Sequence, residues 1–510
     1  MFTRLHSTGI FGIDAYMVDV EADISNSFPS FEIVGLPDTA VKESRDRVRS
    51  ALKNSGFSFP TTKITVNLAP ADIKKAGSMY DLPSLLAILM ASRQLNPTVN
   101  MEECAFIGEL SLDGQLRHIT GLLSMAIEAK TRGIKCFFVP EADAFEASVV
   151  DGIEIYPVSN VKQLVAHLQG EKTIRPAQKP DIKSSAAYCP DFFDVKGQTA
   201  AKKALEIAAA GGHNVLLIGP PGSGKSMLAK RLPSILPSMT FDESIETTKI
   251  HSVAGALSSD TPLIVTRPFR APHHTVSAAG LSGGGIVPRP GEISLSHNGV
   301  LFLDEFPEFS RQAMEVLRAP IEDGKVTISR ASGRLTYPCE FSLVAAMNPC
   351  PCGFFGHPKK KCICSPLAVK KYLGRISGPM LDRLDIHVEV PAVEYDELTG
   401  RSDGETSAEI KKRVERAREI QQNRYKGTKI TCNARLDSAN LQKYCVLTPD
   451  ADRIMRTAFE NLGLSARAYD RILKIARTVA DLDGQEKIGA THIAQAIQFR
   501  SLDRKYWSEL

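Results

Sequence analysis

The pattern of apolar and polar positions changes along the chain. Over residues 1–168, short β-like runs such as Lys63–Leu68 alternate with helix-like runs such as Leu82–Ser92. This alternation predicts an α/β domain. Residues 169–190 are rich in Lys, Pro and Ser, a composition typical of an interdomain linker.

A second α/β unit is predicted over residues 191–395 and a helical region over residues 396–510. In the helical region, apolar residues recur on one face at helical spacing, at Ile472, Ile475, Ala476, Val479 and Ala480. A length of 510 residues also favours several domains, because a single hydrophobic core rarely organises so long a chain.

The strand pattern Asn214–Ile218 leads directly into the glycine-rich run Gly219–Ser226, which is followed by helix-like residues. Strand, glycine-rich loop and helix are the context of a Walker A motif. Lys225 is expected to contact the β- and γ-phosphates of ATP, and the Ser226 hydroxyl to bind Mg²⁺. Three glycines allow successive backbone N–H groups to point at phosphate oxygens: Gly219, Gly222 and Gly224.

Two further apolar runs end in polar residues. Gly299–Leu303 is followed by Asp304 and Glu305, a Walker B arrangement in which Asp304 holds Mg²⁺ and Glu305 polarises the attacking water. Another run ends in Asn348, whose amide can position water near the γ-phosphate; the alternative is a turn-forming Asn before Pro349.

These motifs, with the blocks RPFRAPHHTVS, MNPCPCG and LSARAYDRIL, resemble AAA+ proteins of the magnesium-chelatase and MCM-helicase group. Over nearly its full length the chain resembles the ComM/YifB family. The resemblance implies a P-loop core, with a helix-2 insert and a pre-sensor-1 hairpin, and a helical lid. It also implies ATP and Mg²⁺ as cofactors, a homo-hexamer, and single-stranded or branched DNA as partner.

The resemblance assigns roles to further residues. Asn348 corresponds to sensor 1, Arg383 to an arginine finger that reaches a neighbouring subunit's nucleotide, and Arg467 to sensor 2 of the lid. Residues 323–340 form two β-runs around a turn, resembling a hairpin that points into the pore of hexameric helicases. Its expected DNA contacts are Lys325, Arg330 and Arg334. The alternatives are solvated arginines and an ordinary exposed hairpin.

The N-terminal domain resembles the Lon protease domain, an S5-domain-2-like α/β fold. Residues 108–123 follow the Lon pattern, and Ser78 lies near the position of the Lon nucleophile. The catalytic Lys of Lon, however, aligns with Leu123. Because a Ser–Lys dyad needs that amine as base, we expect a structural or binding module and no proteolysis.

Four cysteines, Cys350, Cys352, Cys362 and Cys364, cluster in a Gly-, Pro- and Lys-containing stretch. Four thiolates can hold a structural Zn²⁺, and His357 could replace one of them. The C-x-C spacing is tighter than usual, so reduced cysteines in a loop remain the alternative. Two adjacent histidines, His273 and His274, are interpreted as structural or DNA-facing, although they could also bind metal.

Composition adds limited information. Apolar residues make up 43% and charged residues 24%, as in ordinary globular proteins. No apolar run is long enough to cross a membrane, so a cytoplasmic protein without a membrane partner is expected. The net charge is +4, and the basic excess lies after residue 400.

The function predicted from these observations is an ATP-driven hexameric DNA motor. By resemblance, it would drive branch migration during recombination in natural transformation. The alternative is a magnesium-chelatase-like ATPase that remodels a partner protein. An active protease is disfavoured by Leu123.

Overall fold

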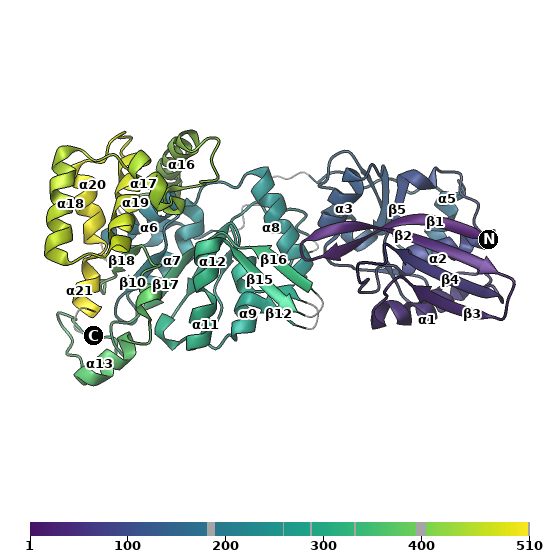
Figure 1. Ribbon diagram of the computed structural model, residues 1–510, viewed down its shortest axis with the longest axis horizontal. Helices are drawn as coiled ribbons and strands as arrows, with labels where there is room; N and C mark the ends of the chain where they lie inside the picture. Colours follow the sequence, from purple (N-terminus) through teal and green to yellow (C-terminus); the bar gives the residue numbers. More distant parts are fainter. Residues whose placement is uncertain (181–188, 259, 286–287, 331–332, 394–403, 508–510) are drawn as a thin grey trace. The chain divides into compact units, whose positions relative to one another are not determined.

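The structure is a computed structural model that describes residues 1–180, 189–258, 260–285, 288–330, 333–393 and 404–507 (Figure 1). Contacts group the chain into two units: unit 1 comprises Met1–Lys183 and Ser244–Ile264, and unit 2 comprises Ser184–Glu243 and Val265–Leu510. The predicted boundary between 395 and 396, and residues 181–188 of the predicted linker, lie outside the described residues.

Unit 1 is built on a mixed seven-stranded sheet in the order β3-β4-β2-β1-β5-β8-β9. The β1–β2 and β2–β4 pairs are antiparallel and the others are parallel. The strands are β1 (Phe2–Phe11), β2 (Asp14–Ser25), β3 (Ser30–Val34), β4 (Lys63–Ala69), β5 (Cys104–Phe106), β8 (Cys136–Pro140) and β9 (Glu154–Val158), and a separate short pair joins β6 (Glu109–Leu110) to β7 (Leu116–Arg117).

Helix α2 lies at the centre of unit 1, and almost every one of its residues is buried. It packs on β1, β2 and α1, which explains why its sequence is apolar all round rather than on one stripe. The helices of this unit are α1 (Thr39–Asn54), α2 (Asp81–Ala91), α3 (Leu122–Thr131), α4 (Ala144–Ala147), α5 (Val161–Leu168) and most of α8 (Phe241–Ala254). The α/β character predicted for this region is confirmed.

Unit 2 contains a five-stranded sheet in the order β11-β14-β17-β10-β18, and all its neighbours are parallel. The strands are β10 (Val215–Ile218), β11 (Phe269–Arg270), β14 (Gly299–Leu303), β17 (Phe341–Met347) and β18 (Ile386–Glu389). β10 and β14 are fully buried along their lengths. A parallel sheet covered on both faces requires such continuously apolar strands.

Around this sheet lie α6 (Thr199–Gly211), α7 (Lys225–Ile235) and several shorter helices (Figure 1). Between β11 and β14 the chain forms α9 (Ala278–Ser282), β12 (Gly283–Gly284), β13 (Arg289–Pro290) and α10 (Glu292–Leu295). Next come α11 (Arg311–Val316), α12 (Arg318–Asp323) and a hairpin of β15 (Lys325–Arg330) and β16 (Gly333–Pro338), and the loop after β17 is followed by α13 (Pro366–Leu373) and α14 (Gly378–Leu381).

The last part of unit 2 is helical, as predicted. It consists of α16 (Ser407–Arg424), α17 (Ser438–Tyr444), α18 (Pro449–Leu462), α19 (Ala466–Leu482), α20 (Ala490–Gln498) and α21 (Ser501–Trp507). Helices α18, α19 and α20 pack side by side, and α16 and α19 also contact α6 (Figure 1). Their apolar faces join the core of the parallel sheet in one continuous hydrophobic cluster.

A buried charge network holds the helical part together. The Asp481 carboxylate accepts hydrogen bonds from Arg424 (2.9 Å), Arg477 (3.1 Å) and Asn433 (2.8 Å). Arg477 is itself fully buried. Removing one partner of a buried pair leaves an uncompensated charge and typically costs about 3–5 kcal/mol, so this network ties α16, α19 and the intervening loop into one body.

Candidate nucleotide-binding site

The predicted phosphate loop lies at the carboxyl edge of the parallel sheet. β10, the first strand of this sheet in chain order, lies between β17 and β18, its fourth and fifth. The chain therefore leaves neighbouring strands in different directions at this point, the position at which parallel α/β sheets commonly bind ligands. Gly219 follows β10, Asp304 follows β14 and Asn348 follows β17, so three separate motifs meet at this edge.

The glycines of the loop are needed for close approach and for backbone conformation. A Cβ on Gly219 would lie 2.1 Å from the Val390 carbonyl oxygen, a distance no side chain tolerates. Gly222 and Gly224 have φ angles of +75° and +90°, in the region that favours glycine. Gly224 is the residue before α7, so the loop ends at the positive end of that helix.

Lys225 is buried at the first position of α7. Its ammonium group donates to the carbonyl oxygens of Gly219 (2.8 Å) and Pro220 (2.9 Å) and to Asn348 Oδ1 (3.2 Å). Burial lowers the pKa of the Lys225 ammonium to about 8, and the Asp304 carboxylate opposes that shift. A phosphate would supply the negative charge that this buried cation lacks.

The residues predicted to bind Mg²⁺ are in direct contact. The Ser226 hydroxyl donates to Asp304 Oδ2 at 2.5 Å. Hydroxyl, carboxylate and phosphate oxygens are the hard ligands that Mg²⁺ prefers. The Ser223 hydroxyl, in the same loop, is buried and has no hydrogen-bond partner among the described residues. Both observations fit a nucleotide with its magnesium ion.

Glu305 has a left-handed backbone conformation, with φ +52° and ψ +44°. Such a conformation costs about 1–3 kcal/mol for a residue other than glycine and is concentrated at functional sites. Its carboxylate lies 3.1 Å from Nδ1 of His274, and the rings of His273 and His274 are 4.1 Å apart. Sequence reasoning missed this pairing, because the two residues are far apart in the chain and on different strand ends.

The two predicted arginines are already engaged within their own subunit. Arg383 is largely buried, with its guanidinium 2.7 Å from Glu322 Oε1 and hydrogen bonds to the carbonyls of Pro379 and Arg318. Arg467 is exposed and lies 3.7 Å from Asp382. The roles of Arg383 and Arg467 in catalysis stay predictions. Glu322, a partner that the sequence did not indicate, sits next to the predicted finger.

The hairpin predicted over residues 323–340 is confirmed: β15 and β16 pair antiparallel, with Ser329 opposite Arg334. One face is buried, and Tyr337 of that face donates to the Pro288 carbonyl (3.0 Å). The opposite face is exposed and carries Lys325, Thr327, Ser329, Arg334 and Thr336. Lys325 lies at the base of the hairpin, opposite Pro338, whereas Arg334 lies near its loop. The side chain of Arg330 is outside the described residues.

The predicted cysteine cluster is assembled: the sulfur atoms of Cys350, Cys352, Cys362 and Cys364 all lie within 4.8 Å of one another. His357 is not part of it, because its Nδ1 accepts the backbone N–H groups of Lys359 and Lys360, both at 3.0 Å. The four ligand atoms that come together are therefore all sulfur.

In unit 1, the serine near the expected nucleophile position contacts a carboxylate. The Ser78 hydroxyl donates to Glu109. Leu123 is fully buried, and its backbone N–H donates to Glu146 Oε1 (2.7 Å). The absence of proteolysis stays a prediction.

Comparison with known proteins identifies the family. The model "Magnesium chelatase, subunit ChlI" matches residues 191–398, "Subunit ChlI of Mg-chelatase" matches 20–143, and "Magnesium chelatase, subunit ChlI C-terminal" matches 404–500. The competence protein ComM of Haemophilus influenzae is 44% identical over 507 residues, covering 98% of this chain and 97% of that protein. The chain belongs to the ComM/YifB family.

Two other relatives are similar to this chain to different extents. The uncharacterized protein YifB of Salmonella typhimurium is 44% identical over 501 residues, with 98% of this chain and 97% of that protein covered. The magnesium-chelatase 38 kDa subunit of Chlorobaculum tepidum is 23% identical over 359 residues, covering 64% of this chain and 83% of that subunit. Members are magnesium-chelatase-like AAA+ ATPases, which implies use of ATP and Mg²⁺. Among the described helices, none combines the length and apolarity required to span a membrane.

Proposed function

We propose that this protein is an ATP-driven DNA motor that works as a homo-hexamer and drives branch migration. The observation that carries the proposal is the convergence of Lys225, Ser226 and Asp304 at one edge of the parallel sheet. In this proposal residues 191–395 form the ATPase core and 396–510 its lid. Residues 1–168 form a non-proteolytic module joined by the linker 169–190.

In the proposed cycle, Lys225 exchanges its backbone carbonyl partners for phosphate oxygens, while Ser226 and Asp304 hold Mg²⁺. The metal, when bound, neutralises charge that develops on the transferred phosphoryl group. Glu305 then accepts a proton from the attacking water, and the Asn348 amide orients that water. Glu305 must leave His274 before it can do so, because the two side chains are in contact at 3.1 Å.

The ring is inferred from Arg383. An arginine finger neutralises the charge on the phosphoryl group that is transferred in a neighbouring subunit. To do so, Arg383 would have to leave Glu322 and contact a nucleotide across a subunit interface. Arg467, which is exposed, would contact nucleotide from the lid as sensor 2. The role of Arg383 across the interface predicts that ATPase activity rises with protein concentration.

A mixing experiment tests the shared site. Lys225→Ala and Arg383→Ala are each expected to lack ATPase activity. In a mixed ring, an Arg383→Ala subunit binds ATP and receives the intact arginine of a Lys225→Ala neighbour, so mixing should restore part of the activity. If mixing restores nothing although both variants assemble, Arg383 does not act across an interface.

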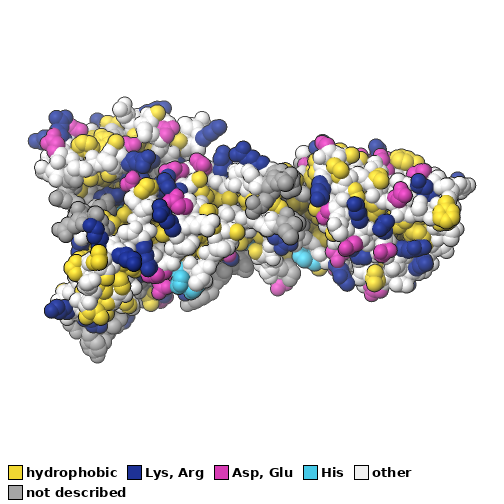
Figure 2. Space-filling view, turned by 60° about the horizontal axis from the view of Figure 1, so that its bottom comes forward, with side chains coloured by type: hydrophobic (Ala, Val, Ile, Leu, Met, Phe, Trp, Pro, Cys, Tyr) yellow, Lys and Arg dark blue, Asp and Glu magenta, His cyan; other side chains and the backbone are white. Residues whose placement is uncertain are grey.

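DNA contact is assigned to the exposed face of the β15–β16 hairpin. On the face drawn in Figure 2, Lys and Arg side chains are interspersed with Asp and Glu. A mixed surface of this kind is poor support for broad electrostatic binding of DNA. The hairpin instead offers a short two-stranded element whose exposed face, in its described part, carries Lys325 and Arg334 beside three hydroxyl side chains.

The test compares Arg334→Ala and Arg330→Ala with Arg453→Ala, an exposed arginine of α18. Each lost phosphate contact should lower the slope of log affinity against log salt by about 0.9. Both hairpin variants are expected to show weaker DNA-stimulated ATPase activity and slower branch migration, whereas Arg453→Ala should match the parent. Normal branch migration by both hairpin variants would exclude the hairpin as the DNA contact.

The place of this motor in recombination during natural transformation is supported by one relative, which is named a competence protein. The alternative, an ATPase that remodels a protein partner, is supported by the match to magnesium-chelatase subunits. ATPase activity measured with and without branched DNA separates them. If no DNA structure stimulates the parent protein, the remodelling function is the better one.

A further inference from the structure

The segment that follows strand β17, residues 348–365, forms no helix or strand. Segments of this length without secondary structure are uncommon in compact domains. Two of its large apolar side chains are exposed, Ile363 at 88% and Phe355 at 38%. The hydrophobic core therefore explains little of its shape. We call residues 349–364 the cysteine loop.

What organises the cysteine loop is its four sulfurs. Cys350, Cys352 and Cys362 have Sγ–Sγ separations of 3.4, 3.5 and 3.7 Å, and Cys364 completes the group. All four are free cysteines. A tetrahedral zinc ion with Zn–S bonds of about 2.3 Å holds its sulfurs about 3.8 Å apart, close to the separations found here.

A backbone N–H group donates a hydrogen bond to one of these sulfurs, as is common around metal-bound thiolates. The N–H of Phe355 donates to Cys350 Sγ at 3.3 Å, the kind of outer hydrogen bond that orients metal-bound thiolates. Gly353 turns the chain between these residues with φ +83°, and its N–H donates to the Cys350 carbonyl at 2.9 Å. An iron–sulfur cluster would need its thiolates farther apart, since several atoms must fit between them.

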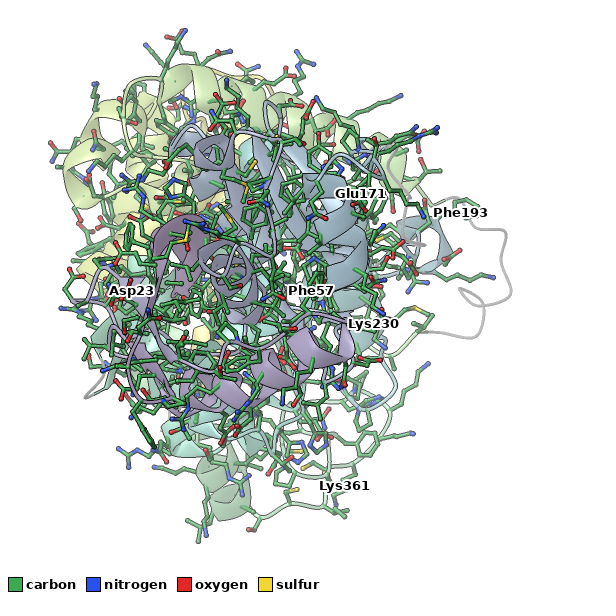
Figure 3. All side chains as sticks on the ribbon, turned by 90° about the vertical axis from the view of Figure 1, so that its right-hand side faces the viewer. Asp23, Phe57, Glu171, Phe193, Lys230 and Lys361 are labelled. Atoms are coloured by element: carbon green, nitrogen blue, oxygen red, sulfur yellow. The ribbon has the colours of Figure 1, made fainter. Side chains whose placement is uncertain are left out.

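The cysteine loop touches the phosphate loop. A Cβ on Gly353 would lie 2.3 Å from Cδ of Pro221, so the Gly353 backbone packs directly against the Pro221 ring. The loop also begins directly after Asn348, which accepts the hydrogen bond of Lys225. Lys361, which precedes Cys362, is exposed and lies toward the lower edge of the view in Figure 3.

We propose that the four cysteines bind one structural Zn²⁺, and that the metal-ordered cysteine loop supports the phosphate loop through Gly353 and Pro221. Bound zinc would fix the conformation of the cysteine loop, which few buried apolar side chains stabilise. The support of the phosphate loop rests on the proposed ATPase function, whereas zinc binding does not.

Metal analysis of the full-length protein, purified without chelators, tests the first half. The parent should carry about one zinc per chain, and Cys352→Ser and Cys362→Ser should lose it. Cys189→Ser, which alters an exposed cysteine outside the cluster, and His357→Ala should keep it. Zinc far below one per chain in the parent, iron in its place, or zinc retained by both ligand variants would overturn the site.

A cobalt experiment avoids reliance on variants that fail to fold. Zinc is removed from the parent with a chelator and replaced with Co²⁺, which gives intense sulfur-to-cobalt charge-transfer absorption when thiolates bind it in tetrahedral geometry. We expect this absorption to appear at one cobalt per chain and to vanish on adding one equivalent of zinc. Its absence from cobalt-treated parent protein would contradict the proposal.

Two glycine variants test the second half. Gly353→Ala should keep zinc yet weaken binding of a fluorescent ATP analogue by about fivefold or more, because the new methyl group displaces Pro221. Gly356→Ala is the matched control: it has a similar φ of +74°, but its Cβ would meet only Lys505, at 3.7 Å. Equal nucleotide affinity in both variants would refute the support of the phosphate loop and leave zinc binding intact. A parent that binds zinc but no ATP would instead contradict the proposed function.

Discussion

Unit 1 and unit 2 both pack helices around a sheet, but the strand directions in the two sheets differ. The unit 2 sheet is parallel throughout, so the ends of β10, β14 and β17 deliver their polar residues to one edge. The unit 1 sheet is mixed. There the buried carboxylates are distributed over several places, and Asp81 and Asp143 each have hydrogen-bond partners within the unit.

The buried acids of unit 1 illustrate this difference. Asp81 is fully buried and accepts from Arg47 at 2.7 Å, and Asp143 accepts the Ile119 N–H at 2.9 Å. Burial raises the pKa of both carboxyls, and these hydrogen bonds oppose the shift. Such pairs complete a fold rather than form a reactive site.

Two buried lysines extend the comparison. Burial lowers the pKa of both Lys75 and Lys225. The ammonium of Lys75 donates to the carbonyl of Ile73, two residues away in the chain. Lys225 instead reaches Asn348, which directly follows strand β17, and lies beside the Ser226–Asp304 pair. What distinguishes the proposed site is therefore convergence from separate strands, not the burial of a charge.

The largest expected effect comes from Glu305. Glu305→Gln keeps the shape of the side chain but removes the proton acceptor, so ATP should remain bound while hydrolysis falls by about 10²–10⁴-fold. Single-turnover hydrolysis and retention of labelled ATP measure this. Glu315→Gln, on the surface of α11, is the control and should hydrolyse normally. Normal turnover by Glu305→Gln would remove Glu305 from the mechanism.

Lys225→Ala should weaken ATP binding and hydrolysis by about 10²–10³-fold, because a preorganised cation at the phosphates is lost. The control in the other unit, Lys75→Met, removes the ammonium but keeps the volume of a fully buried side chain, and it should leave nucleotide affinity unchanged. Equilibrium binding of a fluorescent ATP analogue compares the two. A similar loss of nucleotide affinity in both variants would show that Lys225 has no specific role at the phosphates.

The pH dependence of ATP binding should follow Lys225. Its pKa of about 8 in the free protein should rise when phosphates surround it, so binding takes up a proton above pH 8. Affinity should then be steady below pH 8 and fall by about tenfold per pH unit above it. Lys225→Arg, which stays charged, should flatten the profile. A parent affinity that is constant from pH 7 to 10 contradicts this assignment.

The smallest effect is expected in unit 1. The parent and the Ser78→Ala variant should both show only background peptide hydrolysis. Ser78 contacts a carboxylate, and Leu123 occupies the position of the Lon base. Incubation with unfolded protein substrates and fluorogenic peptides measures this. Hydrolysis by the parent that Ser78→Ala abolishes would make unit 1 an active hydrolase.

Much of this architecture was predictable from residue patterns. The predicted Lys63–Leu68 run is strand β4, and the predicted Leu82–Ser92 run is helix α2, each within one residue. The strand, glycine-rich loop and helix predicted for the Walker A segment are found as β10, the following loop and α7. These elements could be predicted because all of their residues are neighbours in the chain, whereas the nucleotide-binding role of the segment stays a prediction.

Other features depend on pairings that no local pattern encodes. The contact of His274 with Glu305, the pair of Arg383 with Glu322, and the approach of Gly353 to Pro221 each join distant segments. The grouping of Ser244–Ile264 with the N-terminal part of the chain is another example. Such contacts follow from the order of strands and the packing of helices.

The sequence by itself determined the α/β class, the family, the phosphate-binding motif and the four-cysteine set, because each is carried by residue type and spacing. Only the tertiary structure decided which polar groups converge and which are satisfied locally. The physical reason is that a buried polar group must find a partner within hydrogen-bond distance. Which partner is within that distance depends on the three-dimensional path of the chain, as the different surroundings of Lys75 and Lys225 show.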